Sequence, residues 1–599
     1  MAVMAALGTP AECLVRVDQE EIKFNISLVR LDQFIDSHHR LMIRIQQVGT
    51  KEAKKDIDDP GQYTRFLGSN VTLTITPKGG VVDESRALEF IGVITDVRID
   101  NSIDGLNAVV LHAASPTIAM DGAIRNAHYY DKSASDIIGS IVGNYPVTVG
   151  KIESTKGTYK FDTQYRETDF EYVMRLAAGS GMFAWYSGRD FNLGPAGGEK
   201  TVELKWREDL GAFRIGLGTA PVEFKADVYN YEQKKTYSQD SKSISQDAVL
   251  SNISKTSPDA SRKIYKDSGF SSAPKMVGDA QTLDKTLKNE RRKAMGSMIT
   301  CVGQSIVPEL RVGSCARITG MEKLDGQYWV TEVSHIFDES GKYHNTFLCA
   351  PLDIAYPGVK QGRKDLESGE ERKAETASVE RVAATRKEPV VGMHVARVVD
   401  LKDPDKLGRI KISYPWLDSE QTAWVRMVVP HAGKDRGWYA LPELDDEVLV
   451  GYEQGNTDHP IVLGCLYNKG NAPMQEAISS DNDVKMLMTR SGNKIVFNDK
   501  DGAEQIVISQ KDGKNQIVLD ISGPSITIST EGDISVKGKQ NVTIEADQGI
   551  TIKAASDVKI EGANIEIKAS ANIKSEAGAN NEIKGNAMVN VKGGMINLN

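Results

Sequence analysis

The feature that most constrains this chain is a repeat of eight residues near its C-terminal end. In the stretch DISVKGKQNVTIEADQGITIKAASDVKIEG, residues 533–562, a pair of apolar residues spaced two apart recurs every eight residues. Each pair follows a residue that tolerates turns, such as Asp533, Asn541 or Gly549, and polar residues fill the alternate positions. Because a strict repeat sets the architecture, it has to be explained first.

A spacing of two places the apolar side chains on one face of a strand. A helix is excluded, since eight is not a multiple of 3.6 and the stretch is rich in β-branched residues and glycine. The Ile and Val content and the strict phase also argue against a disordered tail. We expect these pairs to form the core of a needle. They are Ile526, Ile528, Ile534, Val536, Val542, Ile544, Ile550, Ile552, Val558, Ile560, Ile565 and Ile567.

Two architectures fit such a repeat. A single-chain β-solenoid with three sides would use three octads for each coil, and its sides would normally differ in sequence. Here every octad looks alike and no coarser period is visible. Equivalent octads suggest equivalent environments, which a three-fold axis supplies when three identical chains wind together. No octad buries enough to be stable alone, so we favour the intertwined homotrimer, with the single-chain solenoid as the alternative.

Composition limits the remaining possibilities. The chain has 599 residues, of which 26% are charged and 40% hydrophobic, as expected of a soluble multidomain protein. A net charge of −9 argues against nucleic acid as the main partner. No apolar stretch is long enough for a transmembrane helix, and the N-terminus lacks the basic region of a signal peptide. We therefore expect a protein made in the cytoplasm.

The cysteines are odd in number and far apart, with no CxxC pair. Such spacing predicts buried thiols in preference to disulfides or a zinc site. They are Cys13, Cys301, Cys315, Cys349 and Cys465.

Residues 1–360 alternate between apolar and polar positions in several strand-like runs. An α+β insertion is expected at about 115–200, where Ser133 with Asp136 and Thr168 with Glu171 have the spacing of capping boxes that begin two helices. A further charged helix is expected around residues 283–298. Residues 361–390 have no large apolar face, which predicts a solvated linker.

Residues 391–473 contain five or so short strands within about eighty residues, the rhythm of a closed five-stranded OB-fold barrel. A neck at 474–505 then leads into the needle at 506–599. Trp416, Trp424 and Trp438 are expected to pack in this barrel or between subunits. A role as a platform for nucleotide bases is disfavoured because the surroundings are acidic and lack a basic groove. The charges of the segment PELDDEV are expected only to solvate a turn.

Several segments in this order carry a family resemblance. LGRIKISYPW, AWVRM and GWYALPELDDEVLVGYEQGNTDHPIVLGCLYN, followed by the octads, resemble the valine-glycine repeat (VgrG-type) spike proteins of type VI secretion and their relatives in phage-like extracellular particles. ETDFEYVMRLAAGSGMFAWY and LDGQYWVTEVSHIF resemble the phage baseplate-hub region. The resemblance extends over nearly the whole chain. The combination of barrel and octads is specific, whereas each hub motif alone is less so.

The resemblance implies a mainly β homotrimer with a hub of β-barrel-like domains, an OB-fold collar and a triple-stranded β-helix needle. The hub would join the spike to baseplate components and to the hexameric protein of the inner tube. The needle would puncture a target envelope and deliver effector cargo, so the protein would be propelled out of the cell or carried on an extracellular particle. Only the neck fills the interval where the phage spike can carry a lysozyme domain.

A tip partner is also implied by the resemblance. The alternation of apolar and polar residues continues through the last strands of the needle. A conical tip protein of the proline-alanine-alanine-arginine (PAAR) type would dock there by backbone pairing. The docking residues would be Val589, Val591, Ile596 and Leu598.

No motif of a known catalytic site, such as GxSxG, HExxH or a P-loop, is present. We therefore expect no catalytic, metal or cofactor site. His335, His344 and Cys349 could meet on neighbouring strands, but strand histidines and a buried thiol are the favoured interpretation. His38 and His39 are adjacent, so on a strand they face opposite sides and cannot share a metal.

Two functions from other classes remain as alternatives. One is a β-helical tailspike enzyme that degrades polysaccharide, which the mixture of Lys and Glu at the outward octad positions disfavours because such enzymes cluster carboxylates. The other is an OB-fold nucleic-acid-binding protein, which the net charge disfavours.

Overall fold

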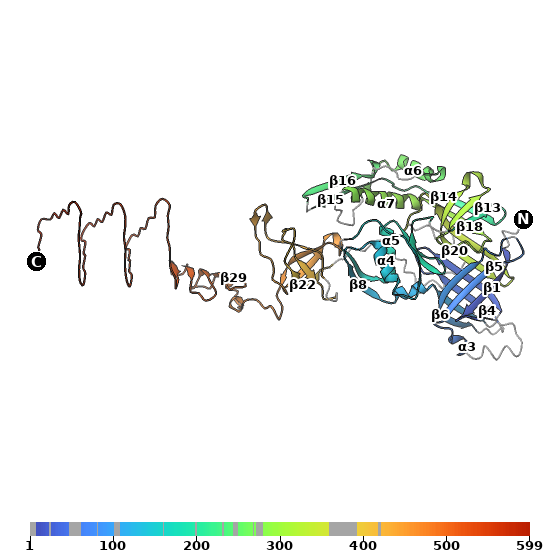
Figure 1. The fold of residues 1–599 in the computed structure, drawn as a ribbon, viewed down its shortest axis with the longest axis horizontal. Coiled ribbons are helices and arrows are strands. Elements are labelled where there is room, and N and C mark those ends of the chain that lie inside the picture. The colour runs from blue at the N-terminus through green and yellow to red at the C-terminus, as the bar shows by residue number, and fades with distance from the viewer. Residues whose placement is uncertain are drawn as a thin grey trace. The chain divides into compact units, whose positions relative to one another are not determined.

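The computed structural model describes residues 8–22, 25–46, 61–80, 82–100, 108–159, 161–197, 200–230, 233–243, 250–267, 269–270, 280–358, 392–416 and 421–598. The chain divides into two compact units, Met1–Ala472 and Pro473–Asn599, and each is described by itself (Figure 1). The linker expected at 361–390 lies outside the described residues.

The first unit is built on a closed barrel of eight strands. They pair in the order β3-β4-β7-β6-β5-β1-β21-β20, and pairing of β20 with β3 closes the ring. Strands β19 and β13 continue the sheet beyond β20, and β18 and β14 continue it beyond β21. The short strand β2 pairs with β1. This architecture confirms the β-barrel-like fold that the resemblance implies for the hub.

The hub strands have the following bounds. They are β1 Thr9–Val17, β2 Glu20–Glu21, β3 Ile26–Phe34, β4 Arg40–Gln46, β5 Asn70–Pro77, β6 Leu88–Asp100, β7 Ala108–Ala114, β13 Thr201–Lys205, β14 Leu210–Leu217, β18 Ile299–Ser305, β19 Cys315–Thr319, β20 Gly326–Asp338 and β21 Lys342–Pro351. Their alternation places one row of side chains inside, as in β5, where Val71, Leu73 and Ile75 are fully buried. Short helices α3 (Gly61–Thr64) and η3 (Glu322–Leu324) lie between hub strands.

The α+β insertion folds around two helices, both with the predicted capping boxes. In α4 (Ala134–Val142) the hydroxyl of Ser133 accepts from Asp136 N at 3.2 Å. In α5 (Asp169–Gly179) that of Thr168 accepts from Glu171 N at 3.1 Å. After α5 the chain forms a hairpin of β11 (Phe183–Tyr186) and β12 (Asp190–Gly194). The other elements are η1 Pro116–Asp121, β8 Ile124–Tyr129, β9 Thr148–Ile152 and β10 Asp162–Thr168.

A second small insertion combines β15 (Phe224–Asn230), β16 (Lys235–Asp240), η2 (Ser241–Ser243) and β17 (Gly269–Phe270) with two helices. Helix α7, Ala280–Met298, confirms the predicted charged helix. Helix α6, Asn252–Ile264, was not predicted. Its buried positions include Ser254, Ser257 and Ser261, so its inner face carries no apolar periodicity to detect.

The collar is a five-stranded sheet in the order β23-β22-β27-β28-β24, and a bridge between Ile410 and Val425 joins its two edges. The strands are β22 His394–Asp400, β23 Lys411–Ser413, β24 Arg426–Met427, β27 Glu447–Tyr452 and β28 Pro460–Leu466, with a side hairpin of β25 Ala432–Gly433 and β26 Arg436–Gly437 and a short helix η5 Glu453–Gly455. Val398, Ile412 and Val450 are among its fully buried core residues. The closed five-stranded barrel confirms the predicted OB fold.

The second unit begins with η6 (Gln475–Ala477) and an antiparallel meander of five strands. They are β29 Val484–Met488, β30 Lys494–Asn498, β31 Gln505–Ser509, β32 Gln516–Asp520 and β33 Ser525–Ser529. The meander crosses the boundary between neck and needle that was placed at residue 505. Over the described residues 530–598 the single chain forms no strand, and Figure 1 draws this segment as an extended trace without arrows.

Candidate functional surfaces and buried polar sites

The twelve predicted needle positions are all exposed in the single chain. From Ile534 to Ile567 the first apolar residue of each pair is the less exposed of the two, for example 54% for Ile550 against 71% for Ile552. The four residues predicted for tip docking, Val589, Val591, Ile596 and Leu598, are exposed as well. An exposed apolar surface of this extent is typical of a site for association.

The meander also carries an apolar face that its own strands leave uncovered. The register aligns one row of apolar side chains across all five strands, and a second row lies two residues away on the same face. The rows are Leu487, Ile495, Ile508, Ile517 and Ile528, and Phe497, Ile506, Leu519 and Ile526. The predicted core residues Ile526 and Ile528 therefore extend an apolar surface that begins in the neck.

The collar tryptophans occupy three different environments. The ring of Trp416 is partly buried and stacks on Tyr414 with 4.7 Å between ring centroids. Trp424 is half-buried, with Lys411 Nζ 5.2 Å from its ring centroid. Trp438 is 53% exposed, so within one chain it does not pack in the barrel. Trp416 therefore packs within the chain, whereas the exposed Trp438 is available for a contact with another molecule.

Trp416 belongs to an aromatic seam between the collar and the α+β insertion, which the sequence analysis did not detect. Tyr165 Oη lies 3.0 Å from His394 Nε2, and its ring centroid lies 5.4 Å from that of Trp416. Thr163 N donates to Asp458 Oδ1 at 2.9 Å. These contacts join segments more than two hundred residues apart in the sequence, so a local sequence motif cannot predict them.

His335 and His344 do not meet, contrary to the site considered for them. His335 is fully buried, with Nδ1 2.7 Å from Tyr343 Oη and Nε2 3.2 Å from Gln33 Oε1. It pairs in register with Asn345, so the adjacent His344 lies on the other face of β21. Cys349 lies opposite Cys301, and both are buried. The favoured interpretation, a strand histidine and a buried thiol, agrees with these positions.

His38 forms an arrangement that resembles a catalytic triad. Its Nδ1 lies 2.8 Å from Thr117 Oγ1 and its Nε2 lies 2.9 Å from Asp121 Oδ2. The Thr117 side chain is 2% exposed, and its hydroxyl lies 2.7 Å from that of Ser115. Because Asp121 also accepts from the N-cap hydroxyl of Thr168 at 2.5 Å, this chain of hydrogen bonds fixes α5 to the barrel. A buried hydroxyl cannot reach a substrate.

His39 is fully buried between the rings of Phe90 and Tyr186. Burial lowers the pKa of His39 to about 3, and burial likewise lowers the pKa of His335 to about 3. Both rings are therefore neutral at neutral pH.

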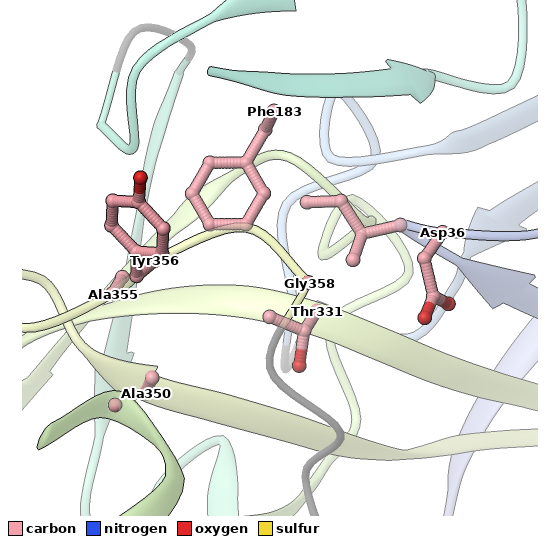
Figure 2. A pocket seen from close by; sticks show the side chains of 9 residues that line it. Asp36, Phe183, Thr331, Ala350, Ala355, Tyr356 and Gly358 are labelled. Carbon is pink, nitrogen blue, oxygen red and sulfur yellow. The ribbon is translucent and has the colours of Figure 1, made fainter. Parts of the chain in front are cut away.

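The pocket in Figure 2 is small. Its free space is about 20 Å³, enough for about one water molecule. Figure 2 shows the rings of Phe183 and Tyr356 on one side and Asp36 on the other. Across the described residues, no group of three or more His, Cys, Asp or Glu side chains is placed to hold a metal ion.

Two parts of the first unit match known protein families. Residues 48–341 match the family of the phage tail baseplate hub, and residues 394–467 match the family of the OB domain of type VI secretion and phage-baseplate injectors. A hub followed by this collar in one chain is the arrangement of the spikes that the sequence resembles. The two matches together support a VgrG-type spike protein.

Two relatives that parts of this chain match are named as type VI secretion system spike proteins. It is 39% identical over 74 residues to the type VI secretion system spike protein VgrG2a of Pseudomonas aeruginosa, which is 12% of this chain and 9% of that protein. It is 31% identical over 113 residues to VgrG1a of the same organism, which is 17% of this chain and 18% of that protein. The matched stretches thus span less than a fifth of these relatives' length.

Among solved structures, the PdpA-VgrG complex of Francisella has a similar fold. The TM-score is 0.53 at 7% identity, and the likeness covers 87% of this chain and 80% of that one. At this identity the likeness concerns the fold alone. No helix in the described parts of the chain is long and apolar enough to cross a membrane.

Proposed function

We propose that this chain is the trimeric spike and hub of a contractile injection machine, which caps the inner tube and punctures a target envelope. The observation that carries the proposal is the exposure of all twelve predicted needle residues, ten of which lie in a described segment, 530–598, that forms no strand of its own. Side chains that recur in strict phase and find no partner within one chain are suited to meet their copies around an axis.

The energetics favour three chains. Full burial of an Ile or Val side chain contributes roughly 1.5–3 kcal/mol. Each octad supplies two such side chains, so three chains bring six to the axis at each level. In one chain the backbone N–H and C=O groups of this segment form no strand-to-strand hydrogen bonds. Pairing between chains would supply those hydrogen bonds. A single-chain solenoid would instead have paired these residues within the chain.

The experiment is light scattering of the full chain over a range of concentrations. A trimer has three times the mass of one chain, which is 65.5 kDa. A stable species with the mass of one chain would refute the trimeric spike and favour the single-chain solenoid.

The partners follow from this role. The barrel hub would dock on the hexameric protein of the inner tube and on baseplate components, and the machine would carry effector cargo out of the cell. The Francisella complex pairs a VgrG with PdpA, which supports cargo or accessory binding by proteins of this fold. Val589, Val591, Ile596 and Leu598 would receive a PAAR-type tip protein, a role supported by their exposure.

We also infer that the chain has no catalytic activity of its own. His38, the histidine with the most catalyst-like partners, has a buried hydroxyl beside it, and the pocket in Figure 2 holds about one water. The test is incubation of the pure full chain with bacterial cell wall and with polysaccharide. Degradation that a point substitution abolishes would overturn the inference in favour of an enzyme.

A further inference from the structure

The collar carries a projecting hairpin, residues 428–440, which we name the collar arm. It leaves the barrel after β24 and includes β25 and β26. Ten consecutive residues, 431–440, are exposed. Two aromatic side chains stand next to each other on it, Trp438 at 53% and Tyr439 at 78% exposure. Trp and Tyr are the residue types that most often anchor protein interfaces.

The collar arm has a defined shape. Trp438 N donates to His431 O at 2.9 Å, and Ala432 pairs with Gly437. Gly437 has a φ of 142°, and a Cβ there would lie 2.5 Å from His431 O, so only glycine fits. The ring of Tyr439 lies close to Gly408, where a Cβ would be 3.3 Å from the ring. A preorganised arm loses little entropy when it binds.

A complementary surface lies on the same collar. Leu444, Leu466 and Tyr467 are exposed apolar side chains, and Asp445 and Asp446 lie beside them. Glu447 pairs with Leu466 in the sheet, which places the acidic turn next to the end of β28. We name Leu444, Asp445, Asp446, Leu466 and Tyr467 the acceptor surface. Asp445 lies 3.4 Å from Arg397, an exposed pair that contributes little.

The register places arm and acceptor at one end of the barrel. His394, Tyr452 and Pro460 lie together at the end that faces the hub seam. Strand β28 runs away from that end to Leu466, and β24 runs parallel to it before the collar arm begins. The arm and the acceptor surface therefore both lie at the end of the collar remote from the α+β insertion.

The charges of the two surfaces are opposite. The collar arm carries Lys434 and Arg436 with Asp435 between them, whereas the acceptor surface carries Asp445 and Asp446. An aromatic pair with basic neighbours fits an apolar patch with an acidic rim, because opposite charges set orientation while the apolar contact supplies affinity.

We propose that the collar arm of each copy docks on the acceptor surface of the next copy of this chain. The inference rests on the proposed trimer and specifies one contact within it. Two different surfaces of one domain that fit each other produce a head-to-tail contact, and such a contact closes into a ring when it is repeated around a three-fold axis. The contact gives Trp438 the packing partner that one chain lacks.

The test uses the exposed Cys465, which lies next to Leu466, and a second cysteine on the arm in place of Ala432. Three other cysteines are buried, and burial raises the pKa of Cys13 to about 12. Burial also raises the pKa of Cys465, but its side chain is exposed, so a short bis-maleimide reagent reaches the two chosen positions and is used at mildly alkaline pH. In full-length Ala432→Cys each copy has one thiol for each neighbour, and we expect covalent trimers on a denaturing gel. Lys434→Cys is a second arm position.

Chains with one exposed cysteine are the matched controls. Wild type, and Ala432→Cys combined with Cys465→Ser, can give dimers at most. Adding Trp438→Ala and Tyr439→Ala to Ala432→Cys should reduce covalent trimers at least tenfold while light scattering still reports three chains.

The outcomes separate this inference from the proposed function. Three chains in solution with only monomers or dimers on the gel for both arm cysteines would refute the arm contact and leave the trimeric spike standing. A single chain in solution would refute the trimeric spike and, with it, the arm contact.

Discussion

The two buried histidines of the hub predict a specific sensitivity to acid. His39 and His335 each have a pKa lowered by burial to about 3, whereas an unperturbed imidazole in the unfolded chain has a pKa of about 6.5. The unfolded chain therefore binds protons first as the pH falls. The stability that the neutral rings confer is complete above about pH 6.5 and is lost progressively down to about pH 3.

The magnitude follows from this window. Between pH 7 and pH 5 each ring should lower the free energy of unfolding by about 2 kcal/mol, or about 4 kcal/mol for both. The loss should be local to the barrel, because His39 lies just before β4 and His335 lies on β20, which pairs with β3.

The assay is hydrogen–deuterium exchange of the β3 and β20 amides at pH 7 and pH 5, corrected for intrinsic exchange rates. His39→Leu removes one titrating ring, so about half of the pH-dependent loss should disappear. His431→Ala is the matched control, since this histidine is exposed on the collar arm and lies outside the barrel. Equal opening free energies at the two pH values, or the same pH slope in His39→Leu, would refute the reasoning.

Three further predictions concern the needle, the tip and the collar. Ile550→Lys should abolish the trimer seen by light scattering, because it brings three ammonium groups to the axis at a cost of several kcal/mol each. Lys553→Ala should leave the trimer intact, and equal effects of the two substitutions would show that the inward and outward positions are wrongly assigned. Removal of residues 589–599 should abolish binding of a PAAR-type cone in a pull-down without changing the trimer, and equal binding by both chains would contradict the docking site. Asp403→Asn should lower the thermal stability of the collar, because Arg409 is buried and would lose its buried carboxylate partner, keeping only the exposed Asp405. The guanidinium hydrogen bonds of Arg409 hold the pKa of Asp403 well below its usual range. An unchanged melting temperature would contradict this prediction.

Local signals in the sequence were sufficient wherever the structure is local. The capping boxes at Ser133 and Thr168 formed as predicted because each involves residues three apart. The collar could be predicted as an OB barrel because its strands follow one another within a short stretch with turns between them. The octads were detectable because their period is strict.

Long-range features could not be predicted from the same signals. The hub barrel closes by pairing Phe34 with Glu332, about three hundred residues apart, and alternation within a strand does not identify its neighbour. The two hydrogen-bond partners of His38, Thr117 and Asp121, both lie in η1, about eighty residues further along the chain, so adjacency to His39 was the only cue in the sequence. Trp438 was expected to pack in the barrel or between subunits, and the sequence does not separate the two because a barrel strand and a projecting hairpin have similar composition. Its exposure in one chain excludes the barrel and leaves the contact between subunits as a prediction.

The two units differ in how their stability arises, and this difference has a consequence for assembly. The hub and collar bury continuous apolar cores within one chain, among them Leu73 and Val450. The described residues 530–598 bury nothing comparable, and the meander before them leaves its apolar face open. The first unit can therefore fold before it meets another copy, whereas the needle depends on partners for its core. We accordingly expect needle formation to follow folding of the first unit and to depend on protein concentration. Because an uncovered needle exposes many Ile and Val side chains, each chain is at risk of aggregation until its copies arrive. A collar that brings three copies together first would shorten that interval, because tethering the chains raises the effective concentration of the octads around one axis.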